Sequence, residues 1–135
     1  MDDFDYLVAR VDPWISKYHR FGADVLTPIE TVGVGVWMLE AEVNNGGFGQ
    51  YYCNSGGDLA LSTVGALKSI GAARAAGVLE AANAEFPDAS PPNERSKRQE
   101  VLDRCRFKAH DTRFQDYRDD LLSLLANYLR QHQPG

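Results

Sequence analysis

Residues 26 to 58 read LTPIETVGVGVWMLEAEVNNGGFGQYYCNSGGD, and this stretch decides the expected fold. It opens with a strong helix start signal. Thr27 is a preferred N-cap residue, Pro28 suits the first helical turn, and Glu30 completes a capping box by reaching back to the cap. The signal predicts that a helix begins at residue 28.

The residues after this start predict the most buried helix of the protein, over residues 28–43. Apolar side chains recur every three or four positions along one face, at Ile29, Val32, Val36, Leu39 and Val43. Val34, Trp37 and Met38 lie off that stripe, so the helix is apolar on more than one side. Gly33 and Gly35 each lower the helix propensity by about 1 kcal/mol, and we expect them to allow the close approach of a neighbouring helix.

Residues 44–58, NNGGFGQYYCNSGGD, predict a polar corner after this helix. The Asn-Asn-Gly-Gly run is typical of a left-handed C-cap, residues 48–53 of a short helical turn, and Asp58 of a cap for the next helix. Two interpretations stay open: the side chains satisfy one another and the backbone, or they line a small polar pocket for a ligand or substrate. The candidate residues are Glu42, Asn44, Asn45, Gly46, Gly47, Phe48, Gln50, Tyr51, Asn54, Gly57 and Asp58.

The rest of the chain also has helical spacing, and no alternating run of β-branched residues predicts a strand. Asp12 and Pro13 resemble an N-cap and a first helical position, which predicts two short helices in the N-terminal region. Further helices are expected from the apolar sets Ala60, Val64, Leu67 and Gly71, then Ala75, Leu79, Ala82 and Phe86, then a polar helix from about Glu94, and a last helix through Tyr117, Leu121, Leu124 and Tyr128. We expect one all-α domain over residues 1–135, a bundle of six or seven helices.

The chain is acidic, and the acidity is concentrated near its start. The formal net charge is −5, and residues 1–60 hold nine acidic against three basic residues. Such a surface argues against direct binding of nucleic acid, and it can meet a basic partner protein. The candidates for a partner-facing acidic surface are Asp2, Asp3, Asp5, Asp12, Asp24 and Glu40; the alternative is an ordinary solvated exterior.

Signals for catalysis and metal binding are weak. The run from Cys53 to Gly57 lacks the features of a nucleophile elbow, and His19, His110 and His132 have no fixed relation to Cys53 or Ser55 in the sequence. No histidines or cysteines have the spacing of metal ligands, and no phosphate loop occurs. We expect no catalytic residue, no metal and no cofactor.

Apolar runs are too short for a membrane span and the N-terminus lacks a signal peptide, so we expect a cytoplasmic protein that binds no membrane. Cys53 and Cys105 fit reduced thiols, with a disulfide as the alternative. The aromatics Trp37, Phe48, Tyr51 and Tyr52 fit a buried core better than a base-stacking platform. Trp14 and Phe21 fit either the core or an exposed stripe for a homodimer.

Three segments together are similar to a bacterial all-helical family that carries the label of DNA-mimic proteins. They are the stretch quoted above, PPNERSKRQEVLD at residues 91–103, and FKAHDTRFQDYRDDLLSLLANYLRQH at residues 107–132. The resemblance covers about residues 20–132. It departs from the usual family pattern at Tyr52, Gly56 and Gln115, where phenylalanine, serine and an aromatic residue are common.

The resemblance implies an all-helical fold and a protein that imitates DNA with acidic side chains. We therefore expect a non-catalytic protein that binds and modulates a basic DNA-binding regulator, with binding that weakens steeply with salt. Two alternatives stay open. One is a ligand-binding or enzymatic pocket at the polar corner, and the other is an immunity or antitoxin protein that neutralises a toxin.

Overall fold

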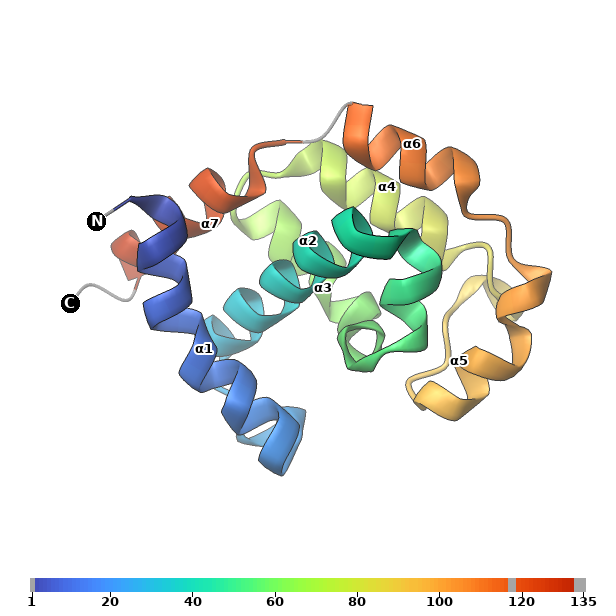
Figure 1. Cartoon of the computed structure of the whole chain (residues 1–135), viewed down its shortest axis with the longest axis horizontal. Coiled ribbons are helices and arrows are strands. Elements are labelled where there is room, and N and C mark those ends of the chain that lie inside the picture. Colours follow the sequence, from blue (N-terminus) through green and yellow to red (C-terminus); the bar gives the residue numbers. More distant parts are fainter. Residues whose placement is uncertain (1, 117–118, 133–135) are drawn as a thin grey trace.

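The computed structural model describes residues 2–116 and 119–132. The described residues form seven α-helices and four short 3₁₀ helices, with no strand among them (Figure 1), so the expected all-α class is confirmed. The α-helices are α1 (Asp3–Phe21), α2 (Pro28–Cys53), α3 (Ala60–Ser69), α4 (Ala73–Asn83), α5 (Arg95–Val101), α6 (Lys108–Asp116) and α7 (Leu121–His132). The 3₁₀ helices are η1 (Ala23–Val25), η2 (Ser55–Leu59), η3 (Pro87–Ala89) and η4 (Leu102–Arg104).

Helix α2 is the centre of the fold, because α1, α3, α5, α6 and α7 all pack against it. Its start is as expected: Thr27 Oγ1 accepts a hydrogen bond from Glu30 N at 3.2 Å, and Glu30 Oε1 accepts one from Thr27 N at 2.9 Å. Val34, Leu39 and Val43 are fully buried on different sides of the helix. The prediction of a central buried helix is confirmed.

The two glycines inside α2 permit close packing. A Cβ atom on Gly33 would lie 2.7 Å from Cζ3 of Trp14 on α1, and one on Gly35 would lie 2.6 Å from Oγ1 of Thr63 on α3. Both distances are shorter than a Cβ contact allows. The glycines therefore let two neighbouring helices reach the backbone of α2, as expected from the sequence.

The end of α2 differs from the expectation of a stop at residue 43. The helix continues to Cys53 across a break at Gly46 and Gly47, and Gly47 has a φ of +76°. The left-handed residue at the corner is confirmed, but the chain resumes its helix directly after it. The reason is a bond from far along the chain: Asp111 Oδ1 accepts from the backbone N–H of Phe48 at 2.7 Å, which caps the second segment.

The N-terminal region forms one helix, so the expected division at Asp12 and Pro13 is wrong. Pro13 lies inside α1 and is exposed. Buried residues lie on both sides of it, Leu7 and Val11 before it and Trp14 and Tyr18 after it. Because one continuous apolar stripe packs on the core, burial outweighs the local cost of a proline inside the helix.

Replacing this proline is expected to stabilise the protein. Pro13→Ala restores an N–H that can donate to the carbonyl of Ala9, one turn earlier in α1. The gain in helix propensity is partly offset by greater freedom of the unfolded chain, which leaves an increase of about 1–2 kcal/mol in the free energy of unfolding. Urea unfolding monitored by circular dichroism measures it, and an unchanged or lower value would show that α1 is already relaxed around Pro13.

Three further details differ from the sequence-based expectation. Asp58 does not cap α3, because its carboxylate pairs with Arg98 and Leu59 takes the cap position. The C-terminal region forms two helices. Helix α7 buries Leu121, as expected, together with Leu125 and Leu129, and Leu124 and Tyr128 pack against the core while only partly buried. Tyr117, expected in that helix, lies outside the described residues. The alanine-rich pair forms α3 and α4, with Ala60, Leu67, Ala75, Leu79 and Ala82 buried, but Gly71 and Phe86 lie after the ends of these helices, Gly71 exposed and Phe86 buried.

Helix α6 is held beside the end of α4 by a hydrogen bond between Glu85 Oε2 and Nε2 of the buried His110, 2.9 Å apart. The hydrogen bond with His110 holds the pKa of Glu85 below its usual value. A lowered carboxyl pKa in the folded state adds stability above the pKa of the unfolded chain, about 4.3, and loses it as the pH falls through the folded value.

Glu85→Gln should therefore lower the free energy of unfolding at pH 5, and the difference from the wild type should shrink by pH 3. We expect less than about 1 kcal/mol, because Glu85 is only partly buried. Urea titrations at both pH values measure it. Glu80→Gln on the exposed side of α4 is the control and should show no such pH dependence. A difference for Glu85→Gln that stays constant from pH 5 to pH 3 would contradict this assignment.

No helix among the described residues is long and apolar enough to cross a membrane. Cys53 and Cys105 are both free thiols. Trp14 is buried in the core, whereas Phe21 is 61% exposed with the guanidinium of Arg20 over its ring.

Candidate functional site

At the polar corner, side-chain amides gather around one carboxylate. Gln50 Nε2 donates to Glu42 Oε2 at 2.6 Å, and Asn54 Nδ2 donates to the same oxygen at 3.2 Å. Asn45 Nδ2 in turn donates to Gln50 Oε1 at 3.1 Å. These residues come from both segments of α2 and from the turn after it. The network therefore holds the two arms of the corner together, and its polar groups are engaged with one another.

A single arginine from α5 holds the inner side of the corner. Arg98 is fully buried, and its guanidinium makes five hydrogen bonds. It donates to the backbone carbonyls of Tyr52, Asn54, Pro92 and Asn93 at 2.8–3.0 Å and to Asp58 Oδ1 at 2.6 Å. Because carbonyls before and after the turn share one rigid guanidinium, Arg98 fixes the path of residues 52–58 against residues 92–93.

The aromatic residues of the corner belong to the core. Phe48, Tyr51 and Tyr52 are fully buried, and the ring of Tyr52 packs against Phe86 and Phe107 at centroid distances of 4.7 and 5.2 Å. The interpretation as core is confirmed for these three residues, which are closed to base stacking. Only Trp37, the fourth candidate, reaches the surface; its ring lies 5.8 Å from that of the exposed Phe4 on α1.

The corner residues thus divide into two groups. Glu42, Asn45, Gln50 and Asn54 bond to one another, and Gly57 and Asp58 lie against Arg98. Asn44 points elsewhere: its Nδ2 donates to Glu40 Oε1 at 2.7 Å on the neighbouring surface of α2. The two groups hold the corner together, whereas Asn44 and Glu40 lie at a neighbouring site.

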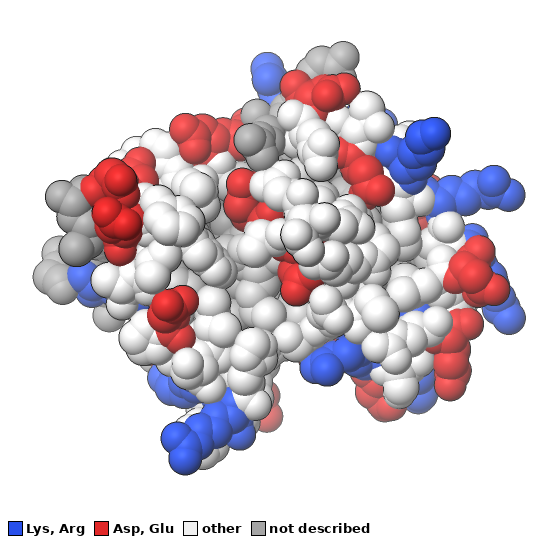
Figure 2. All heavy atoms as spheres, viewed as in Figure 1, with Lys and Arg blue, Asp and Glu red and all other residues white. Residues whose placement is uncertain are grey.

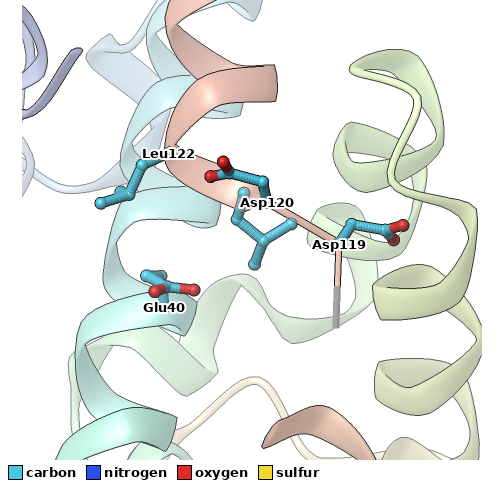
Figure 3. A pocket seen from close by; sticks show the side chains of 5 residues that line it. Glu40, Asp119, Asp120 and Leu122 are labelled. Atoms are coloured by element: carbon cyan, nitrogen blue, oxygen red, sulfur yellow. The ribbon is translucent and has the colours of Figure 1, made fainter. Parts of the chain in front are cut away.

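That site consists of three adjoining hollows that all border Glu40, with volumes of about 320, 190 and 610 Å³. We call them together the Glu40 groove. Figure 3 shows the first hollow, in which Glu40 on α2 faces the segment that enters α7. The groove is lined by Phe4, Trp37, Glu40, Ala41, Asn44, Gln115, Asp116, Asp119, Asp120, Leu121 and Leu122.

The Glu40 groove is acidic on one part and apolar on the other. Its described lining includes four carboxylates and no lysine or arginine. The apolar part lies between α1 and α7, where Phe4, Trp37 and Leu122 meet. Phe4 is 54% exposed, which is unusual for a large aromatic side chain.

Two of these carboxylates also have a structural task. Asp119 Oδ2 accepts from the backbone N–H groups of Arg74 and Ala75 at 3.1 Å, so it caps α4 from a distant part of the chain. Asp120 Oδ1 accepts from the N–H of Ser123 at 3.2 Å and caps α7. Helix N-termini stabilise negative charge, which explains how several carboxylates can lie together here.

The other predicted acidic residues lie along α1 and beyond it. Asp2 caps α1 by accepting from Asp5 N at 2.8 Å, and Asp3 pairs with Arg130 at 2.9 Å. Asp5, Asp12 and Asp24 are exposed. Helix α1 is about 28 Å long at 1.5 Å per residue, so these acids are spread widely. Asp3 and Asp5 flank Phe4, which borders the Glu40 groove. Figure 2 likewise shows acidic side chains in separate groups on the face that it presents.

A protein-family model described as DMP19-like protein matches residues 24–132, which is most of the chain. The chain belongs to the DMP19-like family. This agrees with the family resemblance seen in the sequence, and the match includes α2, the polar corner and the Glu40 groove except Phe4. In comparisons with curated proteins and with solved structures, nothing matched the chain.

Several important residues of this DMP19-like chain escaped the sequence analysis. Arg98 lies in a run of charged residues that is typical of a solvated helix, and nothing local marks it as buried. Asp111 and Asp116 also carry no local signal. Asp119 and Asp120 directly precede the apolar start of α7, and that pattern is an N-cap signal that could have been found.

Proposed function

We propose that this DMP19-like protein is a non-catalytic DNA mimic that binds a basic DNA-binding protein through the Glu40 groove. The observation that carries the proposal is the composition of the groove: the carboxylates of Glu40, Asp116, Asp119 and Asp120 border adjoining hollows, beside an exposed apolar patch. Membership in the family supports it, since the sequence resemblance implies imitation of DNA by acidic side chains.

The chemistry of the groove suits a partner that carries lysine and arginine. Carboxylates on a rigid helical frame offer fixed negative charges to side chains that otherwise contact phosphates. Glu40 is on α2, and its neighbours Asp119 and Asp120 cap α4 and α7. Because these side chains are already ordered, binding a partner would cost little of their conformational entropy.

The apolar part of the groove would supply affinity that charge alone does not. Phe4, Trp37 and Leu122 form a patch that one aliphatic or aromatic side chain of the partner could cover. Contacts that bury such a side chain carry much of the energy of protein interfaces, whereas surrounding charges set the association rate and specificity. The partner surface is therefore expected to be basic with an apolar centre.

The first test is capture of partners from a native lysate with the tagged protein at low and high salt, followed by measured affinities for any captured protein. We expect a basic DNA-binding protein whose affinity falls by at least about tenfold from 50 to 500 mM salt. Glu40→Gln combined with Asp116→Asn should weaken binding by about tenfold at low salt. DNA that carries the partner's binding site should compete with the wild-type protein.

A matched control removes the same charge elsewhere. Asp12→Asn combined with Asp24→Asn also removes two negative charges, and we expect it to change the affinity by less than about threefold because the effect would be long-range only. If the control pair weakened binding more than the groove pair, the partner surface would lie along α1. Affinity that is independent of salt, or the lack of any captured basic protein, would contradict the proposal.

A further inference from the structure

On a different part of the molecule from the Glu40 groove, polar side chains from three elements converge on one hollow. The hollow has a volume of about 290 Å³ and lies between the end of α1, η2 and the start of α5. Its lining includes His19 of α1, Ser55 and Asp58 of η2, and Arg95 of α5. His19 and Arg95 are 76 positions apart in the sequence, so only the fold brings these residues together.

Two of these side chains are directly coupled at the hollow. His19 Nε2 lies 3.1 Å from Ser55 Oγ. The adjacent Tyr18 hydroxyl donates to the backbone carbonyl of Ser55 at 2.8 Å. Burial, followed by the charge of Asp58, raises the pKa of Tyr18 to about 12, so this phenol keeps its proton and continues to hold Ser55 in place. The Ser55 hydroxyl is thus held against His19 by a fixed backbone.

The charged side chains that line the hollow are Arg95 and Asp58. Asp58 Oδ1 lies 2.6 Å from Nη2 of the buried Arg98, which compensates the carboxylate. Arg95 adds a second guanidinium, and its one polar contact with a described residue is a long ion pair of 3.7 Å with Asp58 Oδ2. Because Asp58 is paired with the buried Arg98 behind the lining, Arg95 is the charged group that the hollow offers to a ligand. The Arg95 side chain is 48% exposed and retains N–H donors for a ligand.

We infer that this hollow is a binding site for the phosphate group of a small metabolite. When His19 Nε2–H donates to Ser55 Oγ, the hydroxyl hydrogen of Ser55 is left for a ligand. Together with the guanidinium N–H groups of Arg95, it forms a donor set suited to phosphate. The volume is close to the lower end of ligand pockets, which leaves room for a few atoms beyond the phosphate.

The test uses the intact protein with glycerol 3-phosphate and inorganic phosphate as probes, and acetate at equal ionic strength as a third ligand. Amide NMR spectra recorded during titration should show saturable shifts at Gly22, Ala23 and Ser55, which border the hollow. Acetate should bind more weakly than either phosphate. Tighter binding of the ester than of inorganic phosphate would assign the site to a phosphorylated metabolite, and equal binding would assign it to free phosphate.

Variants separate this site from general charge attraction. Arg95→Gln should weaken binding of both phosphates by about tenfold, and Ser55→Ala by several-fold. Lys97→Gln removes the same charge from the same helix at a residue outside the hollow and should leave the affinity within about twofold. Shifts that do not saturate, or the same affinity in Arg95→Gln and the wild type, would overturn the assignment.

Discussion

Arg98→Met is expected to lower the free energy of unfolding by about 3–5 kcal/mol, the largest effect of any single substitution considered for this protein. The substitution keeps an unbranched side chain of similar length but removes all five donated hydrogen bonds. It leaves the backbone carbonyls of Tyr52, Pro92 and Asn93 without their donor, and the carbonyl of Asn54 keeps only the N–H of Gly57, at 3.2 Å. It also leaves the half-buried carboxylate of Asp58 without its closest cation.

The matched control for this prediction is Arg95→Met, three residues earlier on the same helix. Arg95 approaches the same carboxylate, at 3.7 Å, but it is half-exposed and makes no comparable set of bonds. We expect its loss to cost less than about 1 kcal/mol. Urea unfolding followed by circular dichroism compares the two variants. Equal decreases in the free energy of unfolding would show that the protein depends on positive charge near Asp58 and not on the buried hydrogen bonds of Arg98.

If Arg98→Met does not fold, two further variants keep the question open to measurement. Arg98→Lys retains a cation for Asp58 but loses the planar set of N–H donors that reaches the four carbonyls, so it should fall between the wild type and Arg98→Met. Asp58→Asn combined with Arg98→Lys should cost less than the sum of the two single changes, since both act on one ion pair. Strict additivity would contradict direct coupling between these two residues.

Gly57→Ala is expected to lower the free energy of unfolding by about 2–3 kcal/mol. An added Cβ would lie 2.9 Å from the carbonyl oxygen of Tyr51 and 2.9 Å from Cα of Tyr52. It would also lie 3.0 Å from Nε of Arg98. Two of these neighbours are backbone atoms of α2, so a rotamer change cannot relieve the contact, and the corner itself has to move.

Gly65→Ala is the control with the opposite expected sign. Gly65 is exposed within α3, and an added Cβ would meet no atom within 4 Å. The substitution should raise the free energy of unfolding by up to about 1 kcal/mol, because alanine is the better helix former. Thermal and urea unfolding of both variants measure the contrast. A stabilising effect of Gly57→Ala would mean that the corner is loose enough to accept a side chain.

Local signals in the sequence were reliable where neighbours along the chain decide the structure. The capping box of Thr27 and Glu30 begins α2, as expected, since both partners lie within one turn. The positive φ of Gly47 follows from the Asn-Asn-Gly-Gly run in the same way. A different backbone conformation at these positions would require distant contacts strong enough to override the local signals.

Predictions from local signals failed where burial or a distant partner decides. Pro13 is a good helix start locally, yet one apolar stripe packed on α2 carries α1 through it. Asp58 is a good cap locally, yet its carboxylate pairs with Arg98, 40 positions later. Asp111 restarts α2 after the glycine break from 63 positions away. The spacing of nearby residues in the sequence predicts none of these contacts.

The sequence by itself determined the helical class, the buried central helix and the polar corner, because periodicity and capping are properties of short segments. The sequence also named Glu40 as a candidate acidic residue, and its motifs showed the resemblance to the family. Only the tertiary structure decided what these residues do. In the folded protein, the buried Arg98 holds the corner together, and Asp116, Asp119 and Asp120 border the same groove as Glu40. Packing brings residues that are far apart in the sequence into contact, and local periodicity and capping signals do not show which of these residues will meet.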